Sequence, residues 1–293
     1  MPLYKVYHDG SHFVGIKQDL EAKRSAIPRK RAPETLLHAQ CSELYKIAVS
    51  LGYKSKRKII AFLRDQLYEY GEAVLTEFVP AFVDNEFKKL YERIKRFRRK
   101  AFLNPWNYFI TFTYDSALLD EEAFAKKLPE CLSHLHSRRG WNYMGVWERG
   151  EKGGRLHFHA LAYVPPGEMI GALYPEEYFD KKTHTRRTAW RNTFFDLRFG
   201  RTDFTALSAS DVRRGTVLNY LLKYLQKSGE RIIYSRGVPT DVTVRIPEED
   251  VVLEYIDYVE KAIIADDCLV LSDDVIQAPY MLTDFWWDGI ADG

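Results

Sequence analysis

The sequence predicts an α+β fold in which an antiparallel sheet carries helices on one face. Segments rich in β-branched and aromatic residues alternate with amphipathic segments from residue 107 onward. Their order is strand, helix, strand, strand, an insertion, strand, helix, strand, which is typical of an α+β layer. Before them, residues 35–100 space their apolar side chains by three and four, which predicts a helical accessory region.

The composition is that of an ordinary globular protein. The chain has 293 residues, 46% of them hydrophobic and 14% aromatic, which is enough for one large domain or two small ones. No apolar run reaches the roughly 18 residues of a membrane span, and the N-terminus lacks the pattern of a secretory signal. Cys41, Cys131 and Cys268 lie too far apart for a disulfide framework or a zinc site. We therefore expect a cytoplasmic protein.

The charge is unevenly distributed along the chain, although the formal net charge is only +2. Residues 88–100 hold eight bases and one acid, whereas residues 248–293 hold thirteen acids and Lys261 as their single base. The basic segment indicates a polyanion partner or, alternatively, the solvated face of a helix. The acidic segment is either a plain surface or a mimic that guards a basic groove.

The N-terminal 100 residues form the first predicted region. Residues 1–20 alternate like a pair of hairpin strands with HDGSH as the turn, and residues 23–34 are a basic, proline-bearing linker. The helical part, 35–100, ends with the basic segment. We expect this region, 1–100, to be a mostly helical accessory to the domain that follows.

The main domain is predicted at residues 101–240, and an acidic extension at 241–293. Two helices are expected, one ended by Gly140 and one ending near Gly229. A polar, Arg-rich connection is expected up to about residue 201. The predicted strands are 107–115, 142–149, 155–164, 202–208 and 231–237, and the predicted helices are 121–140 and 214–230.

The hairpin around residue 152 brings three polar side chains together. Its second strand carries His157 and His159, which share a face because they are two apart. A loop at Glu151–Gly154 pairs Glu148 with His157 on that same face. Two imidazoles and a carboxylate suit Mn²⁺, Mg²⁺ or Zn²⁺, with open positions for catalysis.

Two alternatives remain for this hairpin. The histidines could be half-buried and satisfied by neighbouring groups. A slip of one residue in the register would also remove Glu148 from the face, which would leave Glu151 as the available acid.

The helix 217–227 has two distinct faces. Its leucines fall on one stripe, whereas Tyr220, Tyr224, Lys223 and Lys227 gather on the opposite side. A tyrosine can act as a covalent nucleophile, and a nearby ammonium favours its phenolate and neutralises a phosphate. The alternative is an amphipathic helix whose outer face happens to carry two tyrosines.

Three motifs in order resemble those of the HUH superfamily of single-strand DNA nickases. They are FITFTYD at 109–115, His157-Phe158-His159, and YLLKYLQK at 220–227. The paired tyrosines look like those of rolling-circle replication initiators of phages and integrative elements. Glu148, nine residues before the first histidine, matches the usual third metal ligand of related replication proteins. The resemblance covers about residues 100–240.

The resemblance implies a ferredoxin- or RRM-like sheet on which His157, His159 and Glu148 hold Mn²⁺ or Mg²⁺. Tyr220 or Tyr224, with Tyr220 preferred for the first cut, would leave a 5′-phosphotyrosine and a free 3′-OH. Lys223 and Lys227 would steer phosphate or tune the phenols. Thr111 and Thr113 share one strand face and would support the site.

The expected partner is single-stranded origin DNA, with a stem-loop as the candidate origin. No G-x-x-x-x-G-K-[ST] motif occurs, so a separate helicase, that of the host, and a polymerase are expected. The basic segment, with Tyr91 and Phe97 interleaved, would hold DNA by charge and stacking. Its expected DNA contacts are Lys88, Lys89, Arg93, Lys95, Arg96, Arg98, Arg99 and Lys100.

Three other functions compete with a replication nickase. A conjugative relaxase or an HUH transposase would use the same chemistry. A non-catalytic DNA-binding initiator or repressor would bind DNA without regard to metal or to the tyrosines. An unrelated His-x-His hydrolase would form no covalent adduct.

Overall fold

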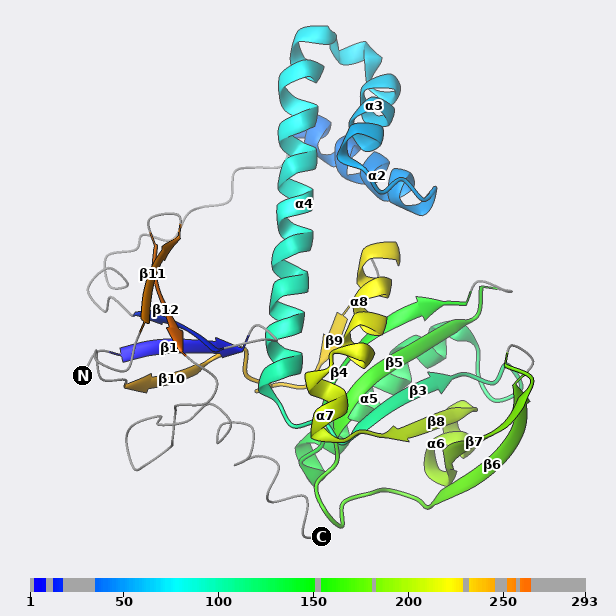
Figure 1. The fold of residues 1–293 in the computed structure, drawn as a ribbon. Coiled ribbons are helices and arrows are strands. Elements are labelled where there is room, and N and C mark those ends of the chain that lie inside the picture. The colour runs from blue at the N-terminus through cyan, green and yellow to red at the C-terminus, as the bar shows by residue number, and fades with distance from the viewer. Residues whose placement is uncertain are drawn as a thin grey trace. The chain divides into compact units, whose positions relative to one another are not determined.

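The computed structural model describes residues 3–8, 13–17, 35–150, 154–180, 183–228, 232–245, 252–256 and 259–264 (Figure 1). The chain divides into two compact units. One unit holds residues 19–96 and 223–229, and the other holds the remainder. Helices α4 and α8 each run from one unit into the other.

A five-stranded antiparallel sheet forms the centre of the larger unit. Its strands are β3 (Tyr108–Thr113), β4 (Asn142–Arg149), β5 (Leu156–Tyr163), β8 (Thr202–Ala206) and β9 (Ile232–Tyr234), in the order β8-β3-β5-β4-β9. A helix follows β3 and another precedes β8. The sheet is therefore built on a ferredoxin-like β-α-β-β-α-β unit, which confirms the predicted α+β class.

One face of this sheet packs on helices α5 (Glu121–Arg139) and α6 (Thr193–Phe199). Asp120 caps the N-terminus of α5, and Gly140 ends it with φ 69°. Alternate strand residues supply the sheet side of the core, and α5 supplies a stripe spaced by three and four. The core includes Ile110, Phe112, Phe124, Leu128, Leu132, Leu135, Trp147, Phe158, Phe195 and Phe199.

A third helix, α8 (Thr216–Ser228), follows the short helix α7 (Ala209–Arg213) and lies against the other face of the sheet. The ring of its Tyr220 contacts Phe109 and His159, which point away from the α5–α6 core. Of the two helices expected, α5 therefore lies on the face that packs the core and α8 lies on the other face, while α6 was not expected.

The predicted Arg-rich connection contains a second hairpin. Strands β6 (Leu173–Asp180) and β7 (Thr185–Asn192) pair antiparallel as a two-stranded sheet, and β7 runs beside β8 (Figure 1). Most of their side chains are exposed, six of eight on the face of Phe179 and four of eight on the face of Tyr178. The apolar–polar alternation that marks a half-buried strand is therefore missing from the sequence.

The two ends of the chain share another antiparallel sheet. The predicted N-terminal strand pair is observed as β1 (Leu3–His8) and β2 (Phe13–Lys17), and its turn lies outside the described residues. Strands β10 (Val242–Arg245), β11 (Val252–Ile256) and β12 (Val259–Ile264) complete the order β10-β1-β2-β12-β11. Strands β1 and β2 thus pair with part of the segment that we expected to be an acidic extension.

The smaller unit is helical, as predicted. It contains α2 (Leu36–Ser50), α3 (Lys56–Gln66), the 3₁₀ turn η1 (Tyr68–Tyr70) and most of α4 (Glu72–Leu103). Thr35 and Ser55 cap α2 and α3 through their hydroxyl groups. The core of this unit includes Cys41, Ile59, Leu63, Val79 and Val83. Within the described part of the chain, none of the helices combines the length and apolarity that a membrane crossing requires.

Candidate metal and nucleophile site

The two histidines and Glu148 lie on one face of the central sheet. Glu148 is paired with His157 across the β4–β5 hairpin, which confirms the predicted register. His159 lies two residues further along β5, opposite Thr111 of β3. This is the face of the sheet away from the α5–α6 core, since the intervening Phe158 is buried in that core.

Two threonine hydroxyls of β3 hold the imidazole rings. Thr113 Oγ1 lies 2.8 Å from His157 Nδ1, and Thr111 Oγ1 lies 3.0 Å from His159 Nδ1. With Nδ1 engaged, each ring turns its Nε2 away from β3. The threonines predicted to support the site therefore share the face and contact the rings directly.

Glu148 and His159 form the closest polar contact of the site. His159 Nε2 donates a hydrogen bond of 2.6 Å to Glu148 Oε2, and both side chains are largely buried. On the hairpin side, His157 Nε2 lies close to the backbone of Gly150, which carries no side chain. A Cβ at position 150 would lie 3.2 Å from that nitrogen.

The surroundings of His157 favour its neutral form. Burial and then the neighbouring His159 lower the pKa of His157, and Glu148 opposes them. A neutral imidazole keeps a lone pair on one ring nitrogen, which is the form that binds a metal ion.

The chemistry of these side chains fits a divalent ion, but their present positions are those of a hydrogen-bonded pair. Among the residues that the structure describes, no three His, Cys, Asp or Glu side chains converge closely enough to hold an ion. The His157 and His159 rings are 6.1 Å apart, centroid to centroid. Ion binding would replace the direct hydrogen bond between Glu148 and His159.

Tyr220 is the tyrosine that the structure brings to the histidine face. Its ring lies 5.5 Å from the His159 ring and 5.9 Å from the Phe109 ring, edge-on to both. Leu218 and Leu221 of the predicted leucine stripe are buried, as expected for the described part of this helix. Tyr220 keeps 40% of its surface exposed, enough for a substrate to reach it.

For the other residues of the predicted tyrosine motif, the structure describes less than it does for Tyr220. Lys223 is exposed on α8 and falls in the helical unit. Tyr224 and Lys227 lie on α8 by their backbone, and their side chains lie outside the described residues. Glu151, the alternative acid, also lies outside them.

A pocket of about 870 Å³ opens over this face. Sequence reasoning missed Arg155, Arg201 and Asp203, which line it together with the histidines and Tyr220. Asp203 lies opposite Thr111 in the β3–β8 pair, so only that long-range pairing reveals it. Burial raises the pKa of the Asp203 carboxyl, and the guanidinium groups of Arg191 and Arg201 oppose this.

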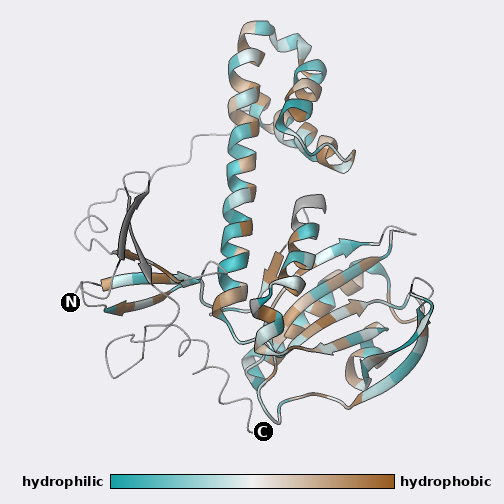
Figure 2. Cartoon of the chain, viewed as in Figure 1, coloured by the Kyte–Doolittle hydropathy of each residue, from teal (hydrophilic) through white to brown (hydrophobic). Residues whose placement is uncertain are grey.

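The basic segment lies on α4, whose C-terminal half is strongly hydrophilic (Figure 2). Lys88, Lys89, Arg93, Arg96 and Arg98 are exposed, whereas Lys95 and Arg99 are half-buried.

Three residues of this segment contact the protein itself and are not placed to bind DNA. Lys100 is buried and donates to the carbonyl of Val238, and the Arg99 guanidinium lies 3.9 Å from the centroid of the Tyr7 ring. Phe97 is 1% exposed and cannot stack on a base, whereas Tyr91 is 63% exposed and can. Helical periodicity turns the end of the segment toward the protein.

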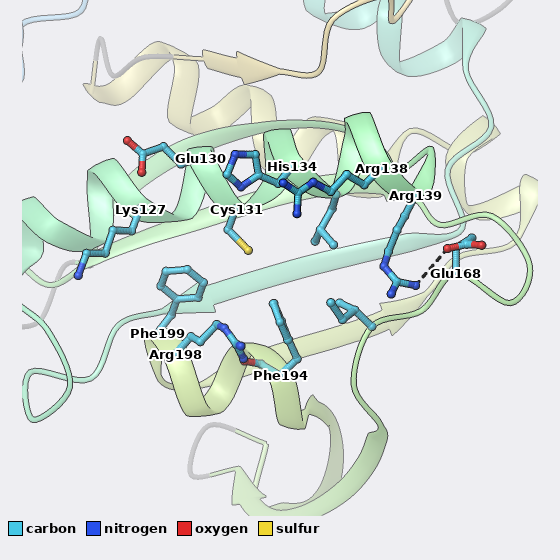
Figure 3. Close-up of a pocket in the computed structure, with 12 residues that line it drawn as sticks. Lys127, Glu130, Cys131, His134, Arg138, Arg139, Glu168, Phe194, Arg198 and Phe199 are labelled. Atoms are coloured by element: carbon cyan, nitrogen blue, oxygen red, sulfur yellow. Dashed lines mark hydrogen bonds and ion pairs between the residues drawn. The ribbon is translucent and has the colours of Figure 1, made fainter.

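A second pocket, of about 750 Å³, lies between α5 and α6 on the opposite face of the sheet (Figure 3). The Arg198 guanidinium lies over the Phe194 ring there, and Arg139 is paired with Glu168. Its floor is largely apolar and includes Cys131, whose pKa is raised by burial. The groups suited to metal and nucleophile chemistry are those of the histidine face.

Comparison with known protein families gives a match over the segment that carries the three motifs. The family model described as replication-associated protein ORF2/G2P matches residues 107–229, the segment that contains β3, the histidines and α8. No curated protein and no solved structure matches the chain. The family match supports a function as a replication initiator, a protein that binds DNA.

Proposed function

We propose that this protein starts rolling-circle replication by cutting one DNA strand through attack of Tyr220 on a backbone phosphate. One observation carries the proposal: Tyr220 lies edge-on to His159, on the face that also holds His157 and Glu148. A phenol next to an imidazole–carboxylate set is a suitable arrangement for phosphoryl transfer. The family match to residues 107–229 supports the same biological role.

The reaction balances without water. The phenolic oxygen of Tyr220 forms a bond to phosphorus while the bond from phosphorus to the 3′ oxygen breaks. The phenol loses its proton and the 3′ oxygen gains one, which leaves a 5′-phosphotyrosine and a free 3′-OH. The 3′-OH would serve a separate polymerase and helicase as primer, and reversal of the same step would rejoin the strand.

The side chains of the face have distinct parts in this scheme. His157, His159 and Glu148 would hold Mn²⁺ or Mg²⁺, with the threonine hydroxyls fixing the rings. A bound ion would polarise the phosphate oxygens. Arg155 and Arg201, which line the same pocket, would bind the neighbouring phosphates of the strand. Tyr224, Lys223 and Lys227 remain the further candidates for strand transfer and phosphate binding.

The test is formation of a covalent protein–DNA adduct. The full chain is incubated with a random pool of single-stranded oligonucleotides and Mn²⁺, then denatured and separated by electrophoresis. We expect an adduct that His157→Ala and Tyr220→Phe abolish. Tyr45→Phe, a change in the helical unit, serves as a matched control and retains it.

The outcomes separate the competing functions. An adduct that survives Tyr220→Phe but not Tyr224→Phe assigns the attack to the second tyrosine. DNA binding with no adduct, indifferent to Mn²⁺, contradicts the proposal and favours a non-catalytic initiator. Sequencing the trapped DNA gives the site of cleavage, and a stem-loop around it would identify the origin.

A further inference from the structure

The β6–β7 hairpin has two chemically different faces. In the pairing of β6 with β7, Tyr178 lies opposite Arg187 on one face, and Phe179 lies opposite Arg186 on the other. Arg191 lies on the Tyr178 side, because it is four residues beyond Arg187 on the same strand. We refer to the side that carries Tyr178, Arg187 and Arg191 as the Tyr178 face.

The Tyr178 face is connected to the histidine site through β8. The Arg201 guanidinium lies 5.7 Å from the centroid of the Tyr178 ring, and the same Arg201 lines the pocket with His157 and His159. Arg191 donates a hydrogen bond of 3.0 Å to the carbonyl of Thr202, which follows Arg201 and is the first residue of β8. The hairpin is thereby held beside the pocket within one compact unit.

One arginine of the Tyr178 face is accessible to a negatively charged ligand. Arg187 is paired with Asp180 at 3.2 Å, with about half of the arginine side chain exposed. The Asp180 side chain is only 20% exposed, so the half-exposed guanidinium of Arg187 is the part of this pair that a phosphate can reach. By contrast, Arg191 is buried and bound to both Glu176 and Thr202, which makes it a positioning residue.

We propose that Tyr178, Arg187 and Arg201 form a track that holds the single-stranded DNA next to the phosphate to be cut. Arginine guanidinium groups bind backbone phosphates, and an aromatic ring stacks on any base. The track explains why an arginine-rich hairpin with exposed side chains on each face is inserted between β5 and β8. It rests on the proposed function, because it extends the same pocket toward the rest of the strand.

The hairpin supplies its own matched control. Arg186 is the residue next to Arg187, points to the opposite face and also has one acidic neighbour, Glu177 at 3.9 Å. Arg186→Ala and Arg187→Ala therefore remove the same charge from the same strand. Arg138→Ala, in the pocket between α5 and α6, removes the same charge on the far face of the sheet (Figure 3).

The first measurement is binding of fluorescein-labelled thymidine 30-mer to the full chain in EDTA, followed by anisotropy over a salt series. We expect Arg187→Ala and Tyr178→Ala to weaken binding about three- to tenfold. Arg187→Ala should also reduce the slope of log affinity against log salt by about 0.7. Arg186→Ala and Arg138→Ala should stay within twofold, and circular dichroism confirms that each variant is folded.

The second measurement is adduct formation from the oligonucleotide pool with Mn²⁺. Arg187→Ala should lower the adduct yield at limiting DNA and recover it at saturating DNA, because it acts on binding alone. Tyr220→Phe should remove the adduct while leaving affinity for the 30-mer within twofold.

The two proposals fail in different ways. Equal losses of affinity for Arg186→Ala and Arg187→Ala, or none for either, would overturn the track while leaving the nickase intact. A loss of affinity confined to the variants of the Tyr178 face, with no adduct from the unsubstituted protein, would keep the track as a surface that binds single-stranded DNA and would overturn the nicking chemistry.

Discussion

At the scale of single residues, the threonine hydroxyls of β3 decide how the histidine rings stand. A histidine on an exposed sheet face can rotate about its side-chain bonds. Here Thr111 and Thr113 each occupy one Nδ1, which fixes the orientation of both rings. A partner on the far nitrogen of a metal-binding imidazole orients the ring and raises its basicity, so such partners commonly change metal affinity 10- to 100-fold.

We therefore predict that Thr111→Val weakens Mn²⁺ binding about tenfold or more. Valine has the shape of threonine but leaves His159 Nδ1 without its hydroxyl partner. Isothermal titration of the metal into the DNA-free protein gives the affinity. Thr205→Val, an exposed position on β8, is the control and should bind as the unsubstituted protein does. Equal affinity in the two variants would contradict the positioning role.

The sequence predicts only part of this arrangement. The convergence of Glu148, His157 and His159 follows from the period of two in a strand and from a short hairpin loop, both local features. The threonine contacts depend on the pairing of β3 with β5, which joins residues more than 40 positions apart. Asp203 escapes prediction for the same reason, since β8 reaches β3 only in the folded sheet.

At the scale of elements, the sequence correctly predicts a helix or strand where one side of the segment is buried and the other is exposed. The leucine stripe of α8 and the apolar residues of α5 identified both helices and their inward faces. The β6–β7 hairpin was missed because ten of its sixteen side chains are exposed, some on each side, so neither strand shows a regular apolar–polar alternation. The short helix α6 was missed as well, because its seven residues cover only two helical turns.

The packing of α2 and α3 with α4 can be tested through a natural thiol. Cys41 on α2 is fully buried, and burial raises the pKa of its thiol from 9.0 to about 11. We predict that iodoacetamide at pH 8 labels Cys131 before Cys41, and labels Cys41 only as urea unfolds the helical unit. Mass spectrometry of the cysteine peptides measures both, and faster labelling of Cys41 in the native protein would contradict this packing.

The same thiol gives the sign of a pH effect. Between pH 9 and about 11 the unfolded chain loses the Cys41 proton while the folded chain keeps it. The contribution of this group to stability is therefore complete below pH 9 and is lost as pH rises through that window.

At the scale of the whole molecule, charge is separated along a nearly neutral chain. The formal net charge is +2, yet the exposed bases of α4 are concentrated within a few helical turns. Lys88, Lys89 and Arg93 are exposed on that helix together with Arg96 and the accessible ring of Tyr91. A concentrated patch attracts a polyanion in a way that an average charge of +2 does not.

The last prediction concerns this patch. Replacing Lys88, Lys89, Arg93 and Arg96 with glutamine should weaken binding of the thymidine 30-mer at least tenfold and reduce the salt slope by up to about 3, since each lost phosphate contact removes about 0.7. Adduct yield at saturating DNA should be unchanged, because the histidine face is intact. The control replaces the same number of bases in the same unit, namely Lys46, Lys54, Arg57 and Lys58. Equal losses in the two variants would show that overall charge, and not α4, attracts the DNA, whereas a loss only in the first would assign the attraction to this helix.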